Sequence, residues 1–313
     1  MKACSNLWKP NIFQQVGDVM SDVIASPSVR RLAGQKGLDL DQLADDLGRQ
    51  TIAREDLDAS TKHASTQTEQ GRQYWDVDHS QYGLVTEEQM SRVAQITAHN
   101  LAAAQAFIPA VTHHDQADIS AIEAFRASLK PEAAVRSVKL TTLAFHVKAL
   151  ARVLLAFPRF NASLSLNGET LILKNYLHIA IAVDTEFGLM VPVIRHVDRK
   201  GLWQIATEIS DLGERAQNRK IRPDEMGGAS MTITNLGGIG GTAFTPIVNP
   251  PEVAILGISR TQITTVWDGD IPAPKPIAPL DLSYDHRVIN GAEAARFMVQ
   301  LTRLLADPRR LLT

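Results

Sequence analysis

Residues 282–291 read Leu-Ser-Tyr-Asp-His-Arg-Val-Ile-Asn-Gly, and they place one histidine where a strand passes into a helix. The strand formers of 280–284 lead to His286, and the apolar spacing of 292–305 predicts a closing helix. Imidazole titrates near neutral pH, so a histidine held there can remove a proton from a hydroxyl or thiol that attacks an acyl group. Taken alone, one histidine among the nine in this chain is more often structural than catalytic.

Several blocks of sequence, in the same order, resemble a known enzyme family. Asp285–Gly291 resembles the Asp-His-Arg-x-x-Asp-Gly signature of the dihydrolipoamide acyltransferases, which are the E2 components of 2-oxo acid dehydrogenase complexes, and of chloramphenicol acetyltransferase. Thr232–Gly237 and Thr245–Gly257 are similar to the central block of that family, and Ile179–Ile194 is similar to its preceding hairpin. The resemblance covers residues 85–313, and agreement over several long blocks is not expected by chance.

The fold expected from this resemblance is the two-layer α/β (α+β) acyltransferase fold, which assembles as a homotrimer with active sites between subunits. The residues themselves agree, because apolar stripes in 140–157 and 202–212 predict two helices that face the core. Residues 171–183 and 189–194 are strand-like and joined by a turn, and the glycines of 237–241 favour a hairpin turn over a phosphate-binding loop.

The resemblance also implies roles for individual residues. His286 is the expected base, and Thr234 lies where the family places a serine or threonine whose hydroxyl stabilises the oxyanion; without the resemblance, Thr234 is simply a strand former. Asn290, the third expected catalytic residue, stands where most members carry aspartate, and a neutral amide supplies hydrogen bonds but no charge. Asp285, Arg287 and Gly291 are expected to support the site, the first two as ion partners that anchor the loop.

The polar residues 60–72 lack apolar periodicity and predict a linker. The predicted organisation is an N-terminal segment (1–24), a small helical domain (25–59), a linker (60–75) and a catalytic domain (76–313). Through Ala25-Ser26-Pro27 and Arg54–Leu57 the small domain resembles the peripheral-subunit-binding domain of E2 enzymes, with helices expected in 26–33 and 39–47.

Residues 45–51 of the small domain depart from that resemblance, because the family carries a glycine-rich turn there. Glycines permit positive φ angles, so their loss implies a different loop, with the second helix extended through Leu47. Two interpretations stay open: residues 25–59 still bind a protein partner, or they are a helical remnant that only tethers the chain.

Composition excludes some classes of function. A net charge of -2 gives no electrostatic argument for nucleic acid or an anionic membrane. The single Cys4 cannot form an internal disulfide, which suits the cytoplasm, and no apolar run approaches the roughly 20 residues that span a bilayer. His113-His114-Asp115 with Asp118 contains metal-ligand residue types but matches no known ligand spacing, so no metal is expected.

The leading hypothesis is a stand-alone acyltransferase that moves an acetyl group from acetyl-CoA, its co-substrate, to a hydroxyl of a small molecule. Only 24 residues precede the small domain, so no lipoate is expected on this chain. Chloramphenicol acetyltransferase acetylates a hydroxyl, and a hydroxymethyl tetronate of polyketide antibiotic biosynthesis is the candidate acceptor. The alternative is the E2 core of a 2-oxo acid dehydrogenase complex with its lipoyl domain on another chain. A third reading, an inactive scaffold, is disfavoured because His286 and Thr234 are both present.

Overall fold

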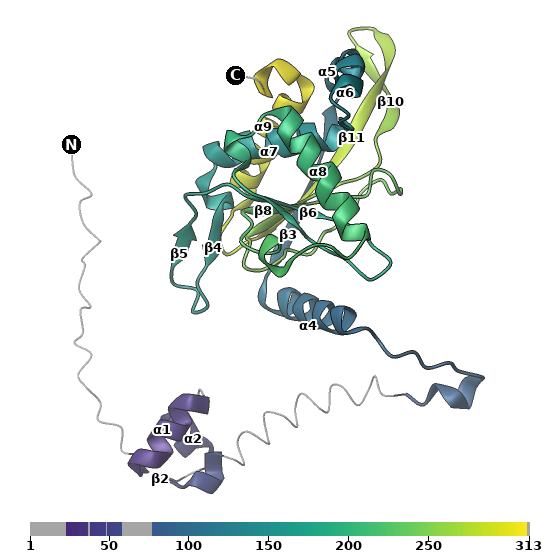
Figure 1. Cartoon of the computed structure of the whole chain (residues 1–313). Helices are drawn as coiled ribbons and strands as arrows, with labels where there is room; N and C mark the ends of the chain where they lie inside the picture. The colour runs from purple at the N-terminus through teal and green to yellow at the C-terminus, as the bar shows by residue number, and fades with distance from the viewer. Residues whose placement is uncertain (1–22, 37, 48, 58–76, 312–313) are drawn as a thin grey trace, which may run out of the picture. The chain divides into compact units, whose positions relative to one another are not determined.

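The computed structural model describes residues 23–36, 38–47, 49–57 and 77–311 of the chain. Its contacts divide the chain into two compact units, Met1–Glu88 and Gln89–Thr313 (Figure 1). The predicted linker at 60–75, Cys4 and nearly all of the segment 1–24 lie outside the described residues. Among the described helices, none has the length and apolar character needed to cross a membrane.

In its described residues the small unit contains the two predicted helices, and residues 54–57 are helical as well. Strand β1 (Ile24–Ala25), α1 (Pro27–Lys36), α2 (Leu40–Leu47) and β2 (Thr51–Ile52) follow in order, and β1 pairs with β2 in parallel. Proline suits the first position of α1 because its missing N–H has no intrahelical partner there. A small apolar cluster, in which Leu57 is fully buried, holds these elements together.

The larger unit alternates helices and strands around one main sheet. Its longer elements, in chain order, are α4 (Arg92–Phe107), β3 (Ala110–Asp118), α5 (Ser120–Ser128), α6 (Lys130–Val135), α7 (Thr142–Ala156), β4 (Ala162–Leu164), β5 (Leu171–Leu173), β6 (Ile179–Ala182), β7 (Val193–Ile194), α8 (Leu202–Gln217), β8 (Met231–Asn235), β9 (Ala254–Ile258), β10 (Gln262–Asp268), β11 (Ile271–Asp285) and α9 (Gly291–Ala306). Short 3-10 turns also occur in this unit at Pro158–Phe160, Val197–Arg199, Pro223–Glu225 and Pro308–Leu311, and one at His79–Tyr82 belongs to the smaller unit.

The main sheet has seven strands in the order β10-β11-β9-β8-β6-β7, and β3 pairs with β11 as well. Strands β6, β8 and β9 are mutually parallel, whereas β11 is antiparallel to β9, β10 and β3. The mixed α/β fold expected from the sequence is therefore observed.

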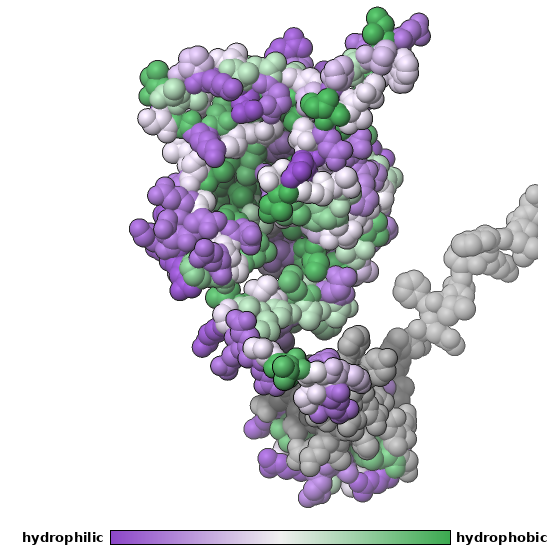
Figure 2. Space-filling view, turned by 90° about the vertical axis from the view of Figure 1, so that its right-hand side faces the viewer, coloured by the Kyte–Doolittle hydropathy of each residue, from purple (hydrophilic) through white to green (hydrophobic). Residues whose placement is uncertain are grey.

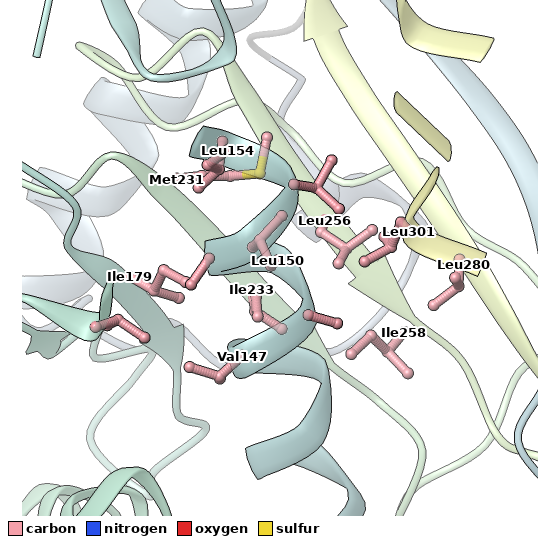
Figure 3. Close-up of a cluster of buried hydrophobic side chains, with 14 of the residues drawn as sticks. Val147, Leu150, Leu154, Ile179, Met231, Ile233, Leu256, Ile258, Leu280 and Leu301 are labelled. Atoms are coloured by element: carbon pink, nitrogen blue, oxygen red, sulfur yellow. The ribbon is translucent and has the colours of Figure 1, made fainter. Parts of the chain in front are cut away.

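One face of the sheet carries the hydrophobic core. Leu150 of α7 and Phe297 of α9 pack against strand residues such as Ile233 and Leu256, and all four are fully buried. Figure 3 shows α7 crossing these strands, with Leu301 of α9 beside it. Successive strand residues point to opposite faces, so burial of Met231 and Ile233 on this face sends Thr232 and Thr234 to the other.

The connection between β8 and β9, residues 236–253, is not the hairpin turn expected from its glycines. Leu236 does accept backbone hydrogen bonds from Ile239 and Gly240, so the chain turns there. However, β8 and β9 are parallel, and parallel strands need a crossover of a dozen or more residues. The hairpin prediction was wrong because glycine indicates a turn without indicating the direction of the strand that follows.

The expected strand over 171–183 is divided into two in the structure. Strand β5 pairs with β4 in a separate two-stranded sheet, and β6 enters the main sheet. Asn161 explains the break, because its side-chain amide donates to the carbonyls of Lys174 and Tyr176 and diverts the chain between the two strands. The second half of the prediction holds, since β6 and β7 are antiparallel and Val183 bridges Met190.

Candidate active site

Thr234 lies near the end of β8, on the sheet face opposite the core. It pairs with Gly257 of β9, Gly257 pairs with Asp281 of β11, and Asp281 pairs with His114 of β3. Residues paired in this way point to the same face, so the four form one row across the sheet. Thr234 is half-buried, and its hydroxyl makes no hydrogen bond to any group in the described part of the chain.

The 236–253 connection folds over this row and contacts it on both sides of Thr234. On one side, a methyl group added to Gly257 would lie 2.7 Å from Cζ of Phe244, so the Phe244 ring rests directly on that glycine. On the other side, the Thr232 hydroxyl donates to Oε1 of Glu252 at 2.9 Å. The connection therefore places an aromatic ring on the strand partner of Thr234 and a buried carboxylate on the residue two positions before it.

His286 follows β11 on a turn that its neighbours hold in place. The buried Asp285 carboxylate accepts hydrogen bonds from the Arg287 guanidinium, the shortest at 2.7 Å, and from the Arg287 backbone N–H at 3.0 Å. That bond to Asp285 raises the pKa of Arg287. The His286 backbone N–H donates to the carbonyl of Pro109, while its imidazole is exposed and has no hydrogen-bond partner among the residues described.

Asn290 caps helix α9. Its side-chain oxygen accepts from the Glu293 backbone N–H at 2.9 Å, which satisfies a donor in the first turn. Its side-chain nitrogen has no hydrogen-bond partner within the described ranges and can donate to a ligand. Gly291, the first residue of α9, lies close to the Tyr284 hydroxyl. The cap and the Asp285 ion pair together fix the two ends of the turn that carries His286.

His286 and Thr234 are far apart within one chain. Asp285, next to His286, donates its backbone N–H to the carbonyl of Val253, which directly precedes β9, whereas Thr234 pairs with Gly257, four residues further along. Strand geometry gives a separation of about 13 Å along the strands and about 10 Å across them. A general base must reach its proton within roughly 3 Å, so one chain cannot bring both groups to one reacting carbonyl.

Glu252 is the most strongly perturbed acid near Thr234. It is 5% exposed, its Oε2 has no hydrogen-bond partner in the described part of the chain, and its Oε1 accepts from Thr232 and Asn249. Burial raises the pKa of Glu252 to about 7, although the Thr232 hydrogen bond and the charge of Lys174 act in the opposite direction. Near neutral pH the Glu252 carboxyl therefore changes its protonation state, and its hydrogen bond to Thr232 links it to the strand that carries Thr234.

Replacing Glu252 with glutamine is expected to change the pH dependence of stability. The folded pKa lies above the unfolded value of 4.5, so the stability contributed by Glu252 is fully present below pH 4.5 and is lost as the pH rises through about 7. Glutamine does not ionise, so above pH 8 the variant should be more stable than the wild type, by on the order of 3 kcal/mol. Thermal unfolding midpoints from pH 5 to pH 9 measure the difference, and parallel curves for the two proteins would contradict it.

The sequence did not reveal Glu252, Phe244 or Asp281 as neighbours of Thr234. The sequence feature that could have indicated Glu252 is its position, because a charged residue directly precedes the apolar strand 253–256. Asp281 is 167 residues from its partner His114, so only strand register could bring the two together. His113-His114-Asp115 lies in β3, where His114 bonds to Asp281 at 2.6 Å.

Comparison with known families identifies both units. Residues 83–313 match the family described as 2-oxoacid dehydrogenases acyltransferase (catalytic domain), and residues 23–49 match the e3 binding domain. The Pseudomonas aeruginosa dihydrolipoyllysine-residue acetyltransferase component of pyruvate dehydrogenase complex is 47% identical over 300 residues, which are 93% of this chain and 55% of that protein. The Azotobacter vinelandii component of the same name is 46% identical over 301 residues, 93% of this chain and 47% of that protein. The chain thus spans about half the length of these curated relatives.

Solved structures agree with these matches. The dihydrolipoamide acetyltransferase (E2p) of Azotobacter vinelandii, studied for the catalytic roles of a serine, a histidine and an asparagine, is 51% identical with a TM-score of 0.74, over 76% of this chain and 98% of that one. The cubic core of the pyruvate dehydrogenase multienzyme complex is 52% identical with the same TM-score and the same coverage. In the Azotobacter enzyme the serine precedes the histidine by 52 residues and the asparagine follows it by four, and Thr234, His286 and Asn290 have the same spacing.

These relatives overturn the leading functional hypothesis from the sequence. Proteins 47%, 46% and 43% identical to this chain are dihydrolipoyllysine-residue acetyltransferases, so the expected stand-alone O-acetyltransferase with a tetronate acceptor was wrong. The hypothesis relied on the short segment ahead of the small domain, and the position at which a sequence begins does not identify an acyl acceptor. The alternative, an E2 core, is the reading that the relatives favour.

Proposed function

Because the chain belongs to the 2-oxoacid dehydrogenase acyltransferase family, we propose that it transfers an acetyl group between coenzyme A and the thiol of a dihydrolipoyl group. The observation that carries this proposal is the shared spacing of Thr234, His286 and Asn290 with the serine, histidine and asparagine of the Azotobacter enzyme. Thr234 is the departure, and threonine retains the hydroxyl that an oxyanion requires.

The chemistry follows from His286 and Thr234, whose side chains have no hydrogen-bond partner among the residues that the structure describes. The His286 imidazole removes the proton of the attacking thiol, and the thiolate forms a bond to the thioester carbonyl carbon. The carbonyl oxygen becomes an oxyanion and accepts a hydrogen bond from the Thr234 hydroxyl. The intermediate then expels the other thiolate, which takes the proton back from His286. The same steps run in reverse, so acetyl-CoA is either product or co-substrate.

The site is assembled between two copies of the chain, with His286 from one copy and Thr234 from the other. The separation of about 13 Å along and about 10 Å across the strands supports this assignment. Exposed apolar surface supports association as well, because Ala104 is the only buried residue of α4, and Ile96 and Phe107 on that helix are 52% and 73% exposed. Figure 2 shows apolar residues gathered in the middle of one face of the larger unit. A cyclic trimer, the assembly expected from the sequence, provides three such sites.

The match of residues 23–49 to the e3 binding domain supports a protein-docking role for the small unit. We take its partner to be the E3 component of the same complex, with the lipoyl group that is acetylated carried on a separate domain. In this chain the Arg49 guanidinium, within the loop that departs from the family pattern, forms an ion pair with Asp56. Arg30 of α1 donates to the Val23 carbonyl at 2.6 Å, which ties the helix to the segment before it.

The proposed function is tested by incubating the chain with acetyl-CoA and dihydrolipoamide and identifying the product by mass. S-acetyl-dihydrolipoamide and free CoA are the expected products, and acetyl-dihydrolipoamide with CoA should regenerate acetyl-CoA. Acetyl transfer in neither direction, by a chain that is folded and assembled, would exclude the function.

A further inference from the structure

Asp281 is a buried carboxylate with a role that the transfer chemistry leaves unassigned. It lies on β11 in the row that contains Thr234, and it is 1% exposed. Three elements donate hydrogen bonds to it or face it: Nδ1 of His114 on β3 at 2.6 Å, the backbone N–H of Phe244 at 3.3 Å, and the hydroxyl of Ser259 after β9 at 3.3 Å. No lysine or arginine lies within ion-pair distance of it in the described residues.

This arrangement separates the two oxygens of Asp281. Oδ1 faces His114, and Oδ2 accepts from Phe244 and Ser259. Burial of a carboxylate is costly unless hydrogen bonds replace its water, so Asp281 requires these donors and in turn holds them. The hydrogen bond from the Phe244 N–H to Asp281 is the one that affects the site, because it joins the 236–253 connection to the sheet.

From that point the Phe244 ring extends over the row that contains Thr234. It lies on Gly257, the strand partner of Thr234, so the ring covers the position next to Thr234 on the adjacent strand. Adjacent strands are about 4.8 Å apart. A short acyl chain bound at Thr234 is long enough to reach the Phe244 ring over that distance. A shift in the Phe244 backbone therefore changes the space beside the carbonyl that Thr234 would bind.

We propose that Asp281, paired with His114, is a positioning residue that fixes Phe244 beside Thr234 and thereby limits the size of the acyl group that the site accepts. The proposal rests on the acetyl transfer function proposed above. Asp281 touches neither substrate, and it acts through the Phe244 backbone.

Two variants at position 281 separate the positioning role from a general loss of structure. Asp281→Ala removes the acceptor for Phe244, whereas Asp281→Asn keeps an oxygen for Phe244 and Ser259 and presents its amide to His114. For Asp281→Ala we expect the ratio of kcat/KM for acetyl-CoA to kcat/KM for butanoyl-CoA to fall by about tenfold, a change typical of altered pocket shape. Asp281→Asn should keep the wild-type ratio.

Hydrogen exchange supplies a readout that does not depend on activity. Amides of residues 242–248 should exchange faster in Asp281→Ala than in the wild type and in Asp281→Asn, while those of strand β9 (Ala254–Ile258) remain protected. Unchanged exchange at 242–248 in Asp281→Ala overturns the proposal, and so does an equal loss of activity with both acyl donors. A wild-type chain that acetylates no thiol refutes the proposed function instead, and the exchange data still decide whether Asp281 holds the loop.

Discussion

Replacing His286 with alanine is expected to lower acetyl transfer by on the order of 10²- to 10⁴-fold, the usual contribution of a general base. The loss should fall on kcat and kcat/KM together, because the imidazole acts on the proton that moves in the transition state. Steady-state rates with acetyl-CoA and dihydrolipoamide, followed by product mass, measure it.

Fold and assembly should survive that substitution. The backbone N–H of residue 286 still donates to Pro109, and the Asp285–Arg287 ion pair is untouched. His79→Ala is the matched control, because His79 is also exposed and its side chain makes no hydrogen bond within the part of the chain that is described. Turnover by His286→Ala close to that of His79→Ala would show that another group removes the proton.

Removing the Thr234 hydroxyl is expected to lower kcat by on the order of 10²- to 10³-fold, as loss of one oxyanion donor does. Thr234→Val is the sharper variant, because it keeps the branched shape in β8 and removes only the hydroxyl. The KM for acetyl-CoA should change little, because the hydrogen bond is strongest when the carbonyl oxygen carries negative charge. Rates of single turnover under saturating acetyl-CoA measure the effect.

Thr234→Ser is the control for this prediction. This variant keeps the hydroxyl, now on serine as in the Azotobacter enzyme, at the same spacing from the histidine. Activity near that of the wild type is therefore expected. A valine variant that raises KM and leaves kcat unchanged would make Thr234 a binding residue instead.

The sequence predicted those parts of the fold that local pattern controls. The apolar stripes indicated α7, α8 and α9, and the structure buries them as expected. The sequence also indicates the turn after β11, because asparagine is favoured at helix N-caps and the strand before the turn is apolar. The direction of β9 relative to β8 could not be predicted, because the glycines of 237–241 indicate a turn whether the next strand is parallel or antiparallel.

The surroundings of the site depend on contacts between distant parts of the chain. Asp281 with His114, and Thr232 with Glu252, meet through strand register and a long connection, and neither pair has a local signature. The acyl acceptor was mispredicted for a related reason. Acceptor choice depends on the side chains that line the site, whereas the motif around His286 specifies only the base and its support.

The central claim is that each site takes His286 from one copy and Thr234 from another, and mixing two inactive variants tests it most directly. His286→Ala and Thr234→Val chains are unfolded together and refolded at equal amounts, so that the copies assemble at random. A site with Thr234 from the first variant and His286 from the second is then intact, and about a quarter of the wild-type activity per site should return. Activity no higher than the mean of the two separate variants, in assemblies shown by mass to contain both chains, would contradict the claim.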